Sequence, residues 1–85
     1  FENNKLTFDV IYIDGYHKAE QVFRDCVNSW NILNINGIMI CDDYIWDHYD
    51  EISNNPCYAI NNFMNTINNY KILKVSNSQL FLKKI

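Results

Sequence analysis

The feature that most constrains the fold is a pair of short apolar runs, each of which ends in acidic residues. The first run, Phe8 to Ile13, is almost continuously β-branched or aromatic and stops at Asp14-Gly15. The second run, Ile38 to Cys41, follows the turn pair Asn36-Gly37 and stops at Asp42-Asp43. A continuous apolar run such as the first is typical of a strand buried on both faces, as in a parallel sheet.

The segment between these runs has the spacing of one helical face. Its apolar residues recur three and four positions apart from Ala19 to Leu33. An apolar helical face of this kind packs against another element, and we expect that element to be the sheet. A crossover helix of this length predicts that the two strands are parallel and that the connection is right-handed.

The second half of the chain predicts one more helix and a hairpin. A polar and aromatic loop leads to Asn55-Pro56, which favours an N-cap followed by proline in the first turn, and the apolar face of this helix ends at Asn68-Asn69. Two β-like runs, Tyr70 to Ser76 and Gln79 to Ile85, are separated by Asn77-Ser78. A turn this short joins antiparallel neighbours, so the expected α/β order is β-α-β-α-β-β.

Composition excludes several classes of protein. The 85 residues carry 7 basic and 10 acidic side chains, a net charge of −3, which argues against nucleic acid as a partner. No apolar run approaches the roughly 18 residues that a membrane span needs. Three widely spaced cysteines, Cys26, Cys41 and Cys57, lie in or beside apolar stretches and are interpreted as reduced core thiols in a cytoplasmic protein.

The acidic residues after the two strands predict a metal site. Strands in one sheet lie about 4.8 Å apart, and parallel strands end at the same edge, so Asp14, Asp42 and Asp43 are expected to face one small volume. Mg²⁺ or another divalent cation, whose ligands are carboxylate oxygens, would relieve their repulsion. The alternative is that these residues cap a helix or a turn, or face solvent.

His17 and the aromatic loop are further candidates. His17 follows Asp14 by three residues, and histidine can act as a general base near neutral pH; the alternative is a solvated loop histidine. The loop with Tyr44, Trp46, His48 and Tyr49 could stack on a substrate as a lid, or could pack on the edge of the sheet.

These residues together resemble a known family. The stretch from Phe8 to His17, which contains Ile-Asp-Gly-Tyr-His, and the stretch from Leu33 to Tyr44, which ends in Asp-Asp-Tyr, are similar to the second half of a class I S-adenosylmethionine-dependent methyltransferase. The resemblance runs from about Phe8 to the end of the chain. It implies a partial Rossmann-like sheet, with parallel strands followed by a C-terminal antiparallel hairpin.

The resemblance also implies roles for individual residues. In the related metal-dependent O-methyltransferases, the positions of Asp14, Asp42 and Asp43 hold a divalent ion that orients the acceptor hydroxyl. Some relatives carry a lysine base at the position of His17, which implies that His17 is the catalytic base. Residues just after this strand lie near the cofactor, which points to Asp14, Gly15 and Tyr16 as the binding residues for S-adenosylmethionine.

The resemblance further implies that residues 1–85 form a single partial domain. The glycine-rich cofactor loop of the family has no counterpart here, because Gly15 and Gly37 are the only glycines. We therefore expect a fragment of an O-methyltransferase. The complete enzyme is expected to act on a small hydroxylated acceptor and could form a homo-oligomer, whereas the isolated fragment is expected to be inactive. One alternative is a non-catalytic remnant or interaction domain that keeps the half-sheet. A phosphoacceptor receiver is disfavoured by the order of its acidic residues.

Overall fold

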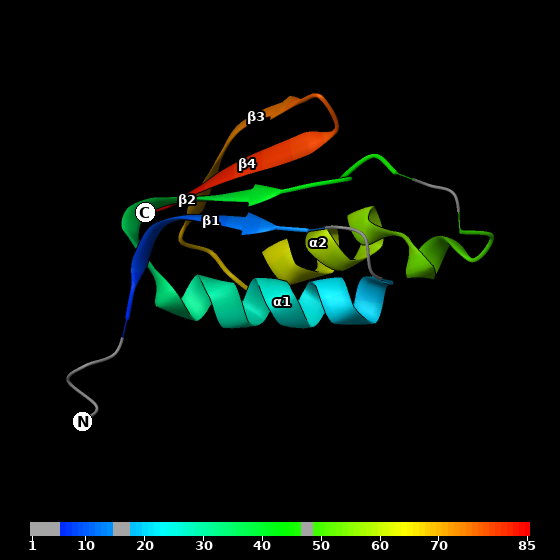
Figure 1. Ribbon diagram of the computed structural model, residues 1–85, viewed down its shortest axis with the longest axis horizontal. Helices are drawn as coiled ribbons and strands as arrows, with labels where there is room; N and C mark the ends of the chain where they lie inside the picture. Colours follow the sequence, from blue (N-terminus) through cyan, green and yellow to red (C-terminus); the bar gives the residue numbers. More distant parts are fainter. Residues whose placement is uncertain (1–5, 15–17, 47–48) are drawn as a thin grey trace.

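Two helices and a four-stranded sheet make up the fold. The computed structural model describes residues 6–14, 18–46 and 49–85, and Figure 1 shows both helices below the sheet. The elements are β1 (Phe8–Ile13), α1 (Ala19–Ile32), β2 (Leu33–Cys41), the 3-10 turn η2 (Ile52–Asn54), α2 (Pro56–Met64), β3 (Tyr70–Ser76) and β4 (Gln79–Lys84).

The sheet has the strand order β1-β2-β4-β3. β1 and β2 are parallel, whereas β4 pairs antiparallel with both β2 and β3. Asn77 and Ser78 join β3 to β4 with φ angles of 53° and 67°, the pair of positive values that a type I′ hairpin turn requires. The structure therefore confirms the predicted α/β class, the parallel pair and the C-terminal hairpin.

The hydrophobic core lies between the helices and one face of the sheet. Trp30 of α1 meets Phe63 of α2 edge to face, with ring centroids 5.6 Å apart. Such contacts bury large aromatic surfaces and stabilise the pairing of the two helices. The core of buried side chains includes Val22, Cys26, Trp30, Met39, Ile60, Phe63, Leu80 and Leu82.

The opposite face of the sheet carries no helix among the described residues. Val10 and Tyr12 of β1 are 59% and 53% exposed on this uncovered face, while Ile13 points into the core. The prediction that the first strand is buried on both faces was therefore wrong for the described chain. The reason is that α1 and α2 both pack on the same side (Figure 1), so alternate residues of β1 face away from them.

β2 begins five residues earlier than the apolar run Ile38 to Cys41 predicted, and the predicted turn lies inside it. The register with β1 shifts between Phe8 and Val10, and Asn36 takes up the irregularity with a φ of 74°. Gly37 has no positive φ; a Cβ on it would lie 2.8 Å from the carbonyl oxygen of Asn34 and 3.0 Å from that of Asp9. Glycine is needed at position 37 because the backbones approach so closely.

We expect Gly37→Ala to destabilise the protein by about 1–3 kcal/mol, because the added methyl group meets backbone atoms that cannot rotate away. Asn36→Gly is the matched control, since glycine accepts the positive φ of that position without strain. Urea unfolding measures both changes. A Gly37→Ala protein that unfolds at the wild-type midpoint would show that the bulge relaxes freely.

Lys84 of β4 closes the C-terminal end of α1. Its Nζ donates hydrogen bonds to the carbonyl oxygens of Trp30, at 2.7 Å, and Leu33, at 2.8 Å. The same ammonium lies 5.5 Å from the centre of the Trp30 ring. The Trp30 carbonyl also accepts a hydrogen bond from the N–H of Leu33, so Lys84 is a second partner for this group. A cation beside the last carbonyl groups of a helix is also favoured by the helix dipole.

Lys84→Met should therefore lower the free energy of unfolding by about 2 kcal/mol, because it removes two charge-assisted hydrogen bonds. Lys83→Met is the control: Lys83 pairs directly opposite Lys71, and removing one of two facing like charges should change stability by less than about 0.5 kcal/mol. Equal losses in the two variants, measured by urea unfolding, would contradict a capping role.

α2 starts at the predicted place and ends earlier than predicted. Pro56 occupies its first turn, but the helix stops at Met64 instead of continuing toward Asn68. Asn55 is in the N-cap position, yet its side chain makes no capping bond. Its Oδ1 accepts a hydrogen bond from the backbone N–H of Tyr49 at 3.1 Å, so the buried amide holds the preceding loop.

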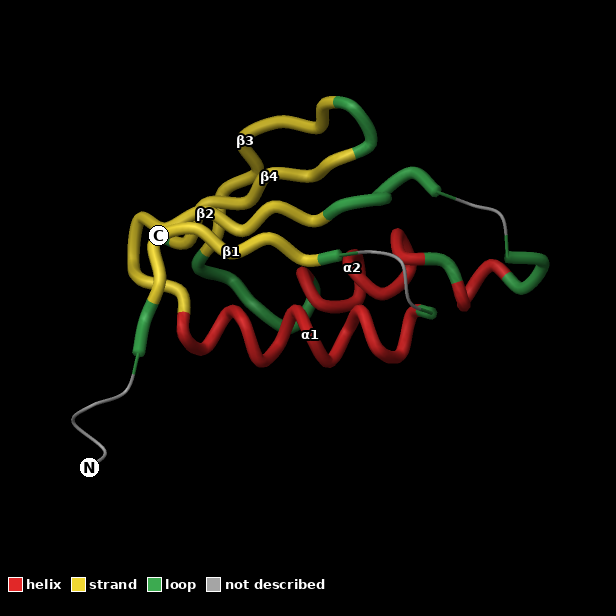
Figure 2. The backbone as a smooth tube through the Cα atoms, in the orientation of Figure 1, coloured by secondary structure: helices red, strands yellow, loops and turns green. Residues whose placement is uncertain are grey.

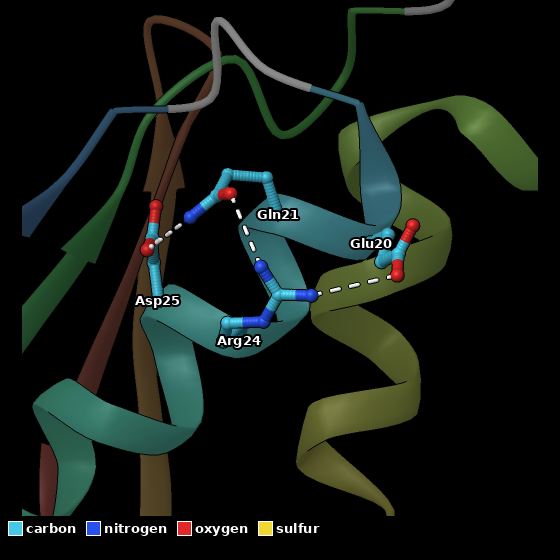
Figure 3. A network of polar contacts seen from close by, with 4 residues as sticks. All are labelled: Glu20, Gln21, Arg24 and Asp25. Carbon is cyan, nitrogen blue, oxygen red and sulfur yellow. Dashed lines mark hydrogen bonds and ion pairs between the residues drawn. The ribbon is translucent and has the colours of Figure 1, made fainter.

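The outer surface of α1 carries a short polar network (Figure 3). Gln21 Nε2 donates to Asp25 at 2.9 Å, and Arg24 bridges to Glu20 at 3.4 Å one turn earlier. The exposed Arg24–Glu20 pair contributes only a few tenths of a kcal/mol. The helix is therefore held mainly by its buried face.

Candidate functional site

The carboxyl ends of β1 and β2 form the edge of the sheet where the acidic residues meet. The chain leaves both strands at the same end of the sheet (Figure 2). Ile13 pairs with Cys41, and the N–H of Asp42 donates to the carbonyl oxygen of Ile13 at 2.9 Å, so the ladder continues one residue beyond β2. The N–H of Tyr44 donates a hydrogen bond to the carbonyl oxygen of Ser78 at 2.8 Å. This bond fixes the turn after β2 against the hairpin.

Three carboxylates lie together at this edge. One oxygen from each of Asp14, Asp42 and Asp43 lies within 4.8 Å of the other two. Oxygens on opposite sides of an ion are about 4.2 Å apart for Mg²⁺ and about 4.6 to 5.2 Å apart for Ca²⁺. Only two of three ligand oxygens can lie on opposite sides of one ion, so the three carboxylates would have to draw closer than 4.8 Å to share it. Their chemistry, three carboxylate oxygens, is that of a site for a hard divalent cation.

Asp42 is held in its ionised form by neighbours that sequence reasoning missed. A hydrogen bond from the Tyr12 hydroxyl is the main cause that lowers the pKa of Asp42, and Gln79 Nε2 donates to Oδ1 at 3.3 Å. The same hydrogen bond with Asp42 raises the pKa of Tyr12, which therefore keeps its proton. Gln79 begins β4, so its contact depends on β4 lying next to β2.

Asp43 has the opposite environment. Partial burial, followed by the charges of Asp42 and Asp14, raises the pKa of Asp43. Its backbone is left-handed, with a φ of 55°, a conformation that aspartate and asparagine tolerate better than most residues. A carboxylate in this position is repelled by its neighbours, and a bound cation would remove that repulsion.

Of the remaining predicted site residues, one belongs to this cluster and the others lie outside the described residues. Asp14, predicted to bind both metal and cofactor, is exposed immediately after β1 and belongs to the cluster. His17, predicted as the base, and Gly15 and Tyr16, predicted to bind the cofactor, lie outside the described residues. His48 of the aromatic loop also lies outside them.

An aromatic pocket lies between the loop after β2 and α2. Tyr44, one residue after Asp43, lines a cavity of about 680 Å³ together with Trp46, Tyr49 and residues of α2. The rings of Trp46 and Tyr49 meet edge to face with centroids 4.9 Å apart. The aromatic residues of this loop therefore line a cavity, and their role as a lid over a substrate stays a prediction.

The cysteines are free thiols and take no part in this cluster. Cys26 and Cys41 are fully buried, and a hydrogen bond between them, together with burial, raises the pKa of the Cys41 thiol well above its usual range. Cys41 is therefore a protonated core residue and not a thiolate ligand or nucleophile. Cys57 is partly buried beside Tyr44.

No helix in the described part of the chain is long and apolar enough to cross a membrane.

Comparison with known proteins gives one family. A family model described as "Methyltransferase domain" matches residues 1–44, which span β1, α1 and β2 together with the three acidic residues of the cluster. None of the curated proteins matches the chain.

Proposed function

This chain belongs to the methyltransferase domain family, and on that premise we propose that it is the metal- and acceptor-binding part of an O-methyltransferase. A methyltransferase domain generally takes its methyl group from a cofactor of the S-adenosylmethionine type. The observation that carries the proposal is the meeting of Asp14, Asp42 and Asp43 at the carboxyl ends of two parallel strands. Ligands of open α/β sheets bind at this edge.

The three carboxylates would hold a divalent cation, either Mg²⁺ or Ca²⁺. When bound, such an ion lowers the pKa of a coordinated hydroxyl group and fixes its orientation. Asp42 is prepared for this role because the Tyr12 hydroxyl and the Gln79 amide already stabilise its charge. These partners also orient the carboxylate, as groups around metal ligands commonly do.

His17 is proposed as the group that accepts the proton of the acceptor hydroxyl. It follows Asp14 by three residues in the Ile-Asp-Gly-Tyr-His stretch, so the sequence keeps it close to one of the proposed ligands. Asp14, Gly15 and Tyr16 are proposed to contact the cofactor. Most of the catalytic effect would come from holding the reacting groups in line.

We further propose that the complete protein contains an upstream half that covers the exposed side of the sheet. Phe8, Val10 and Tyr12 present exposed apolar surface on the uncovered face, and β1 is an edge strand in the described sheet. Open edges and apolar faces of this kind are normally covered in stable proteins. The same surface would suit a binding partner if the chain were an interaction domain.

The test uses the complete gene product. We expect an intact mass well above the 10.1 kDa of this chain, binding of S-adenosylmethionine by calorimetry, and transfer of labelled methyl groups to hydroxylated small molecules when Mg²⁺ is present. A complete product that does not bind the cofactor would overturn the proposal. The interaction domain would then be the better description.

A further inference from the structure

The basic side chains of the chain gather at its C-terminal hairpin. Glu51 is the last acidic residue in the sequence, and the four basic residues that follow it all lie in β3 and β4: Lys71, Lys74, Lys83 and Lys84. Lys84 is used within the fold, where its Nζ donates to carbonyl groups at the end of α1. The hairpin supplies no carboxylate to the other three lysines, so a neutralising charge has to come from elsewhere.

A bulge in β3 brings two of these lysines to one face of the sheet. Lys71 and Lys74 are three residues apart and would face opposite sides in a regular strand. β3 has an extra residue just before Lys74, so Lys71 pairs with Lys83 and Lys74 pairs with Phe81. These two residues of β4 flank the buried Leu82 and therefore point to the uncovered face of the sheet. Lys74 Nζ lies 4.8 Å from the centre of the Phe81 ring, so the two share this face.

β3 also presents an open edge and apolar side chains. It is the outer strand of the described sheet and pairs there with β4 alone, and Figure 1 shows it at the opposite end of the sheet from β1. Ile72 and Val75 pair with buried leucines of β4, so they point to the side of the helices. They are nevertheless 50% and 51% exposed. An outer strand with exposed apolar side chains is a place where another strand can pair.

The lysines decide which strand can pair there. Lysines and bulges on an outer strand work against pairing with a second copy, which would add its own Lys71 and Lys74 to the same edge. An extended segment with acidic side chains on one face would neutralise these lysines, and apolar side chains on its other face would cover Ile72 and Val75. An anionic lipid surface would use the charge but not the open main chain.

We infer that the edge of β3 binds an extended segment of another protein in which acidic and apolar residues alternate. The segment adds a strand to the sheet through main-chain hydrogen bonds. Its acidic side chains face Lys71 and Lys74, and its apolar side chains pack on Ile72 and Val75. This binding does not depend on methyl transfer, because none of the residues proposed to bind metal, cofactor or proton lies on β3.

The test measures binding of short labelled peptides to the complete gene product by fluorescence anisotropy. One peptide alternates glutamate with valine, and a second alternates lysine with valine. We expect the acidic peptide to bind at least about tenfold more tightly than the basic one. Hydrogen exchange at the amides of β3 should become slower in the complex, because a paired strand protects them and ionic contacts between side chains do not.

Charge reversal on β3 should reverse this preference. Lys71→Glu combined with Lys74→Glu should weaken binding of the acidic peptide at least about tenfold and make the basic peptide the tighter ligand. Both side chains are exposed, and a glutamate at position 71 would face Lys83, so the fold should be retained. Lys18→Glu combined with Arg24→Glu is the matched control, since it makes the same change in net charge at exposed positions away from β3 and should keep wild-type binding.

Several outcomes would overturn the inference. These are equal affinity of the wild type for the two peptides, wild-type affinity for the acidic peptide after charge reversal on β3, an equal loss in the control pair, or β3 amides that exchange at the same rate with and without peptide. An absence of binding to either peptide would contradict it as well. Binding to phosphatidylserine vesicles without binding to the acidic peptide would assign the lysines to a membrane surface instead.

Discussion

Asp43→Asn is expected to leave the metal-free protein at least as stable as the wild type and to abolish its response to Mg²⁺. Asp43 is repelled by Asp42 and Asp14, which help to raise its pKa, so removing its charge relieves an unfavourable contact. Asparagine also accepts its left-handed backbone. In the wild type, Mg²⁺ at 100 times its dissociation constant should stabilise the fold by about 2.7 kcal/mol.

Asp42→Asn is expected to change the stability of the metal-free protein in the opposite direction. Asp42 receives hydrogen bonds from Tyr12 and Gln79 that favour its charged form, so this variant should be less stable than the wild type without metal. Both variants should lose the metal response and about 100-fold or more in methyl transfer, since a bound cation supplies several kcal/mol to the transition state. Thermal unfolding of the complete gene product, with and without Mg²⁺, measures both effects.

Glu51→Gln is the control for a general loss of negative charge. Glu51 is an exposed carboxylate on the loop before η2, remote in sequence from the three cluster residues. It should keep the full Mg²⁺ response and the full rate. A wild-type protein with no response to Mg²⁺ or Ca²⁺, or an Asp43→Asn protein that responds like the wild type, would contradict a metal site at this edge.

The sequence predicted the elements whose signal is local. The run Phe8 to Ile13 and the helical spacing from Ala19 gave the observed starts of β1 and α1, because periodicity of apolar residues reflects burial on one element at a time. The hairpin turn at Asn77 was also predicted, since two polar residues between two strands can only form a tight antiparallel turn. The meeting of the three carboxylates follows from the same reasoning, because parallel neighbours end together.

Features that depend on the arrangement of whole elements were not predicted. The contact of Gln79 with Asp42 required knowing that β4 and not β3 lies beside β2, which the hairpin alone does not specify. The exposure of Val10 required knowing that α1 and α2 share one face of the sheet. The early start of β2 was hidden because Asn36 and Gly37, read as a turn, are accommodated as a bulge in the ladder.

His17→Gln should lower the rate of methyl transfer by about 10² to 10⁴ while leaving binding of S-adenosylmethionine and Mg²⁺ unchanged. Glutamine keeps a polar side chain of similar size but cannot accept the proton. Histidine has an ordinary pKa of about 6.5, so the wild-type rate should fall at acidic pH as the base becomes protonated, and the variant should lose this dependence. The readouts are the turnover number, calorimetric affinities and the pH profile.

Two further variants separate a base from a structural residue. His17→Lys should restore part of the rate with a pH profile displaced upward, because a lysine can accept a proton once it is neutral and its ordinary pKa is about 10.4. His48→Gln is the matched control at the other histidine and should keep the wild-type rate. Equal losses of turnover and of cofactor affinity in His17→Gln would indicate that His17 supports the binding site and that another group accepts the proton.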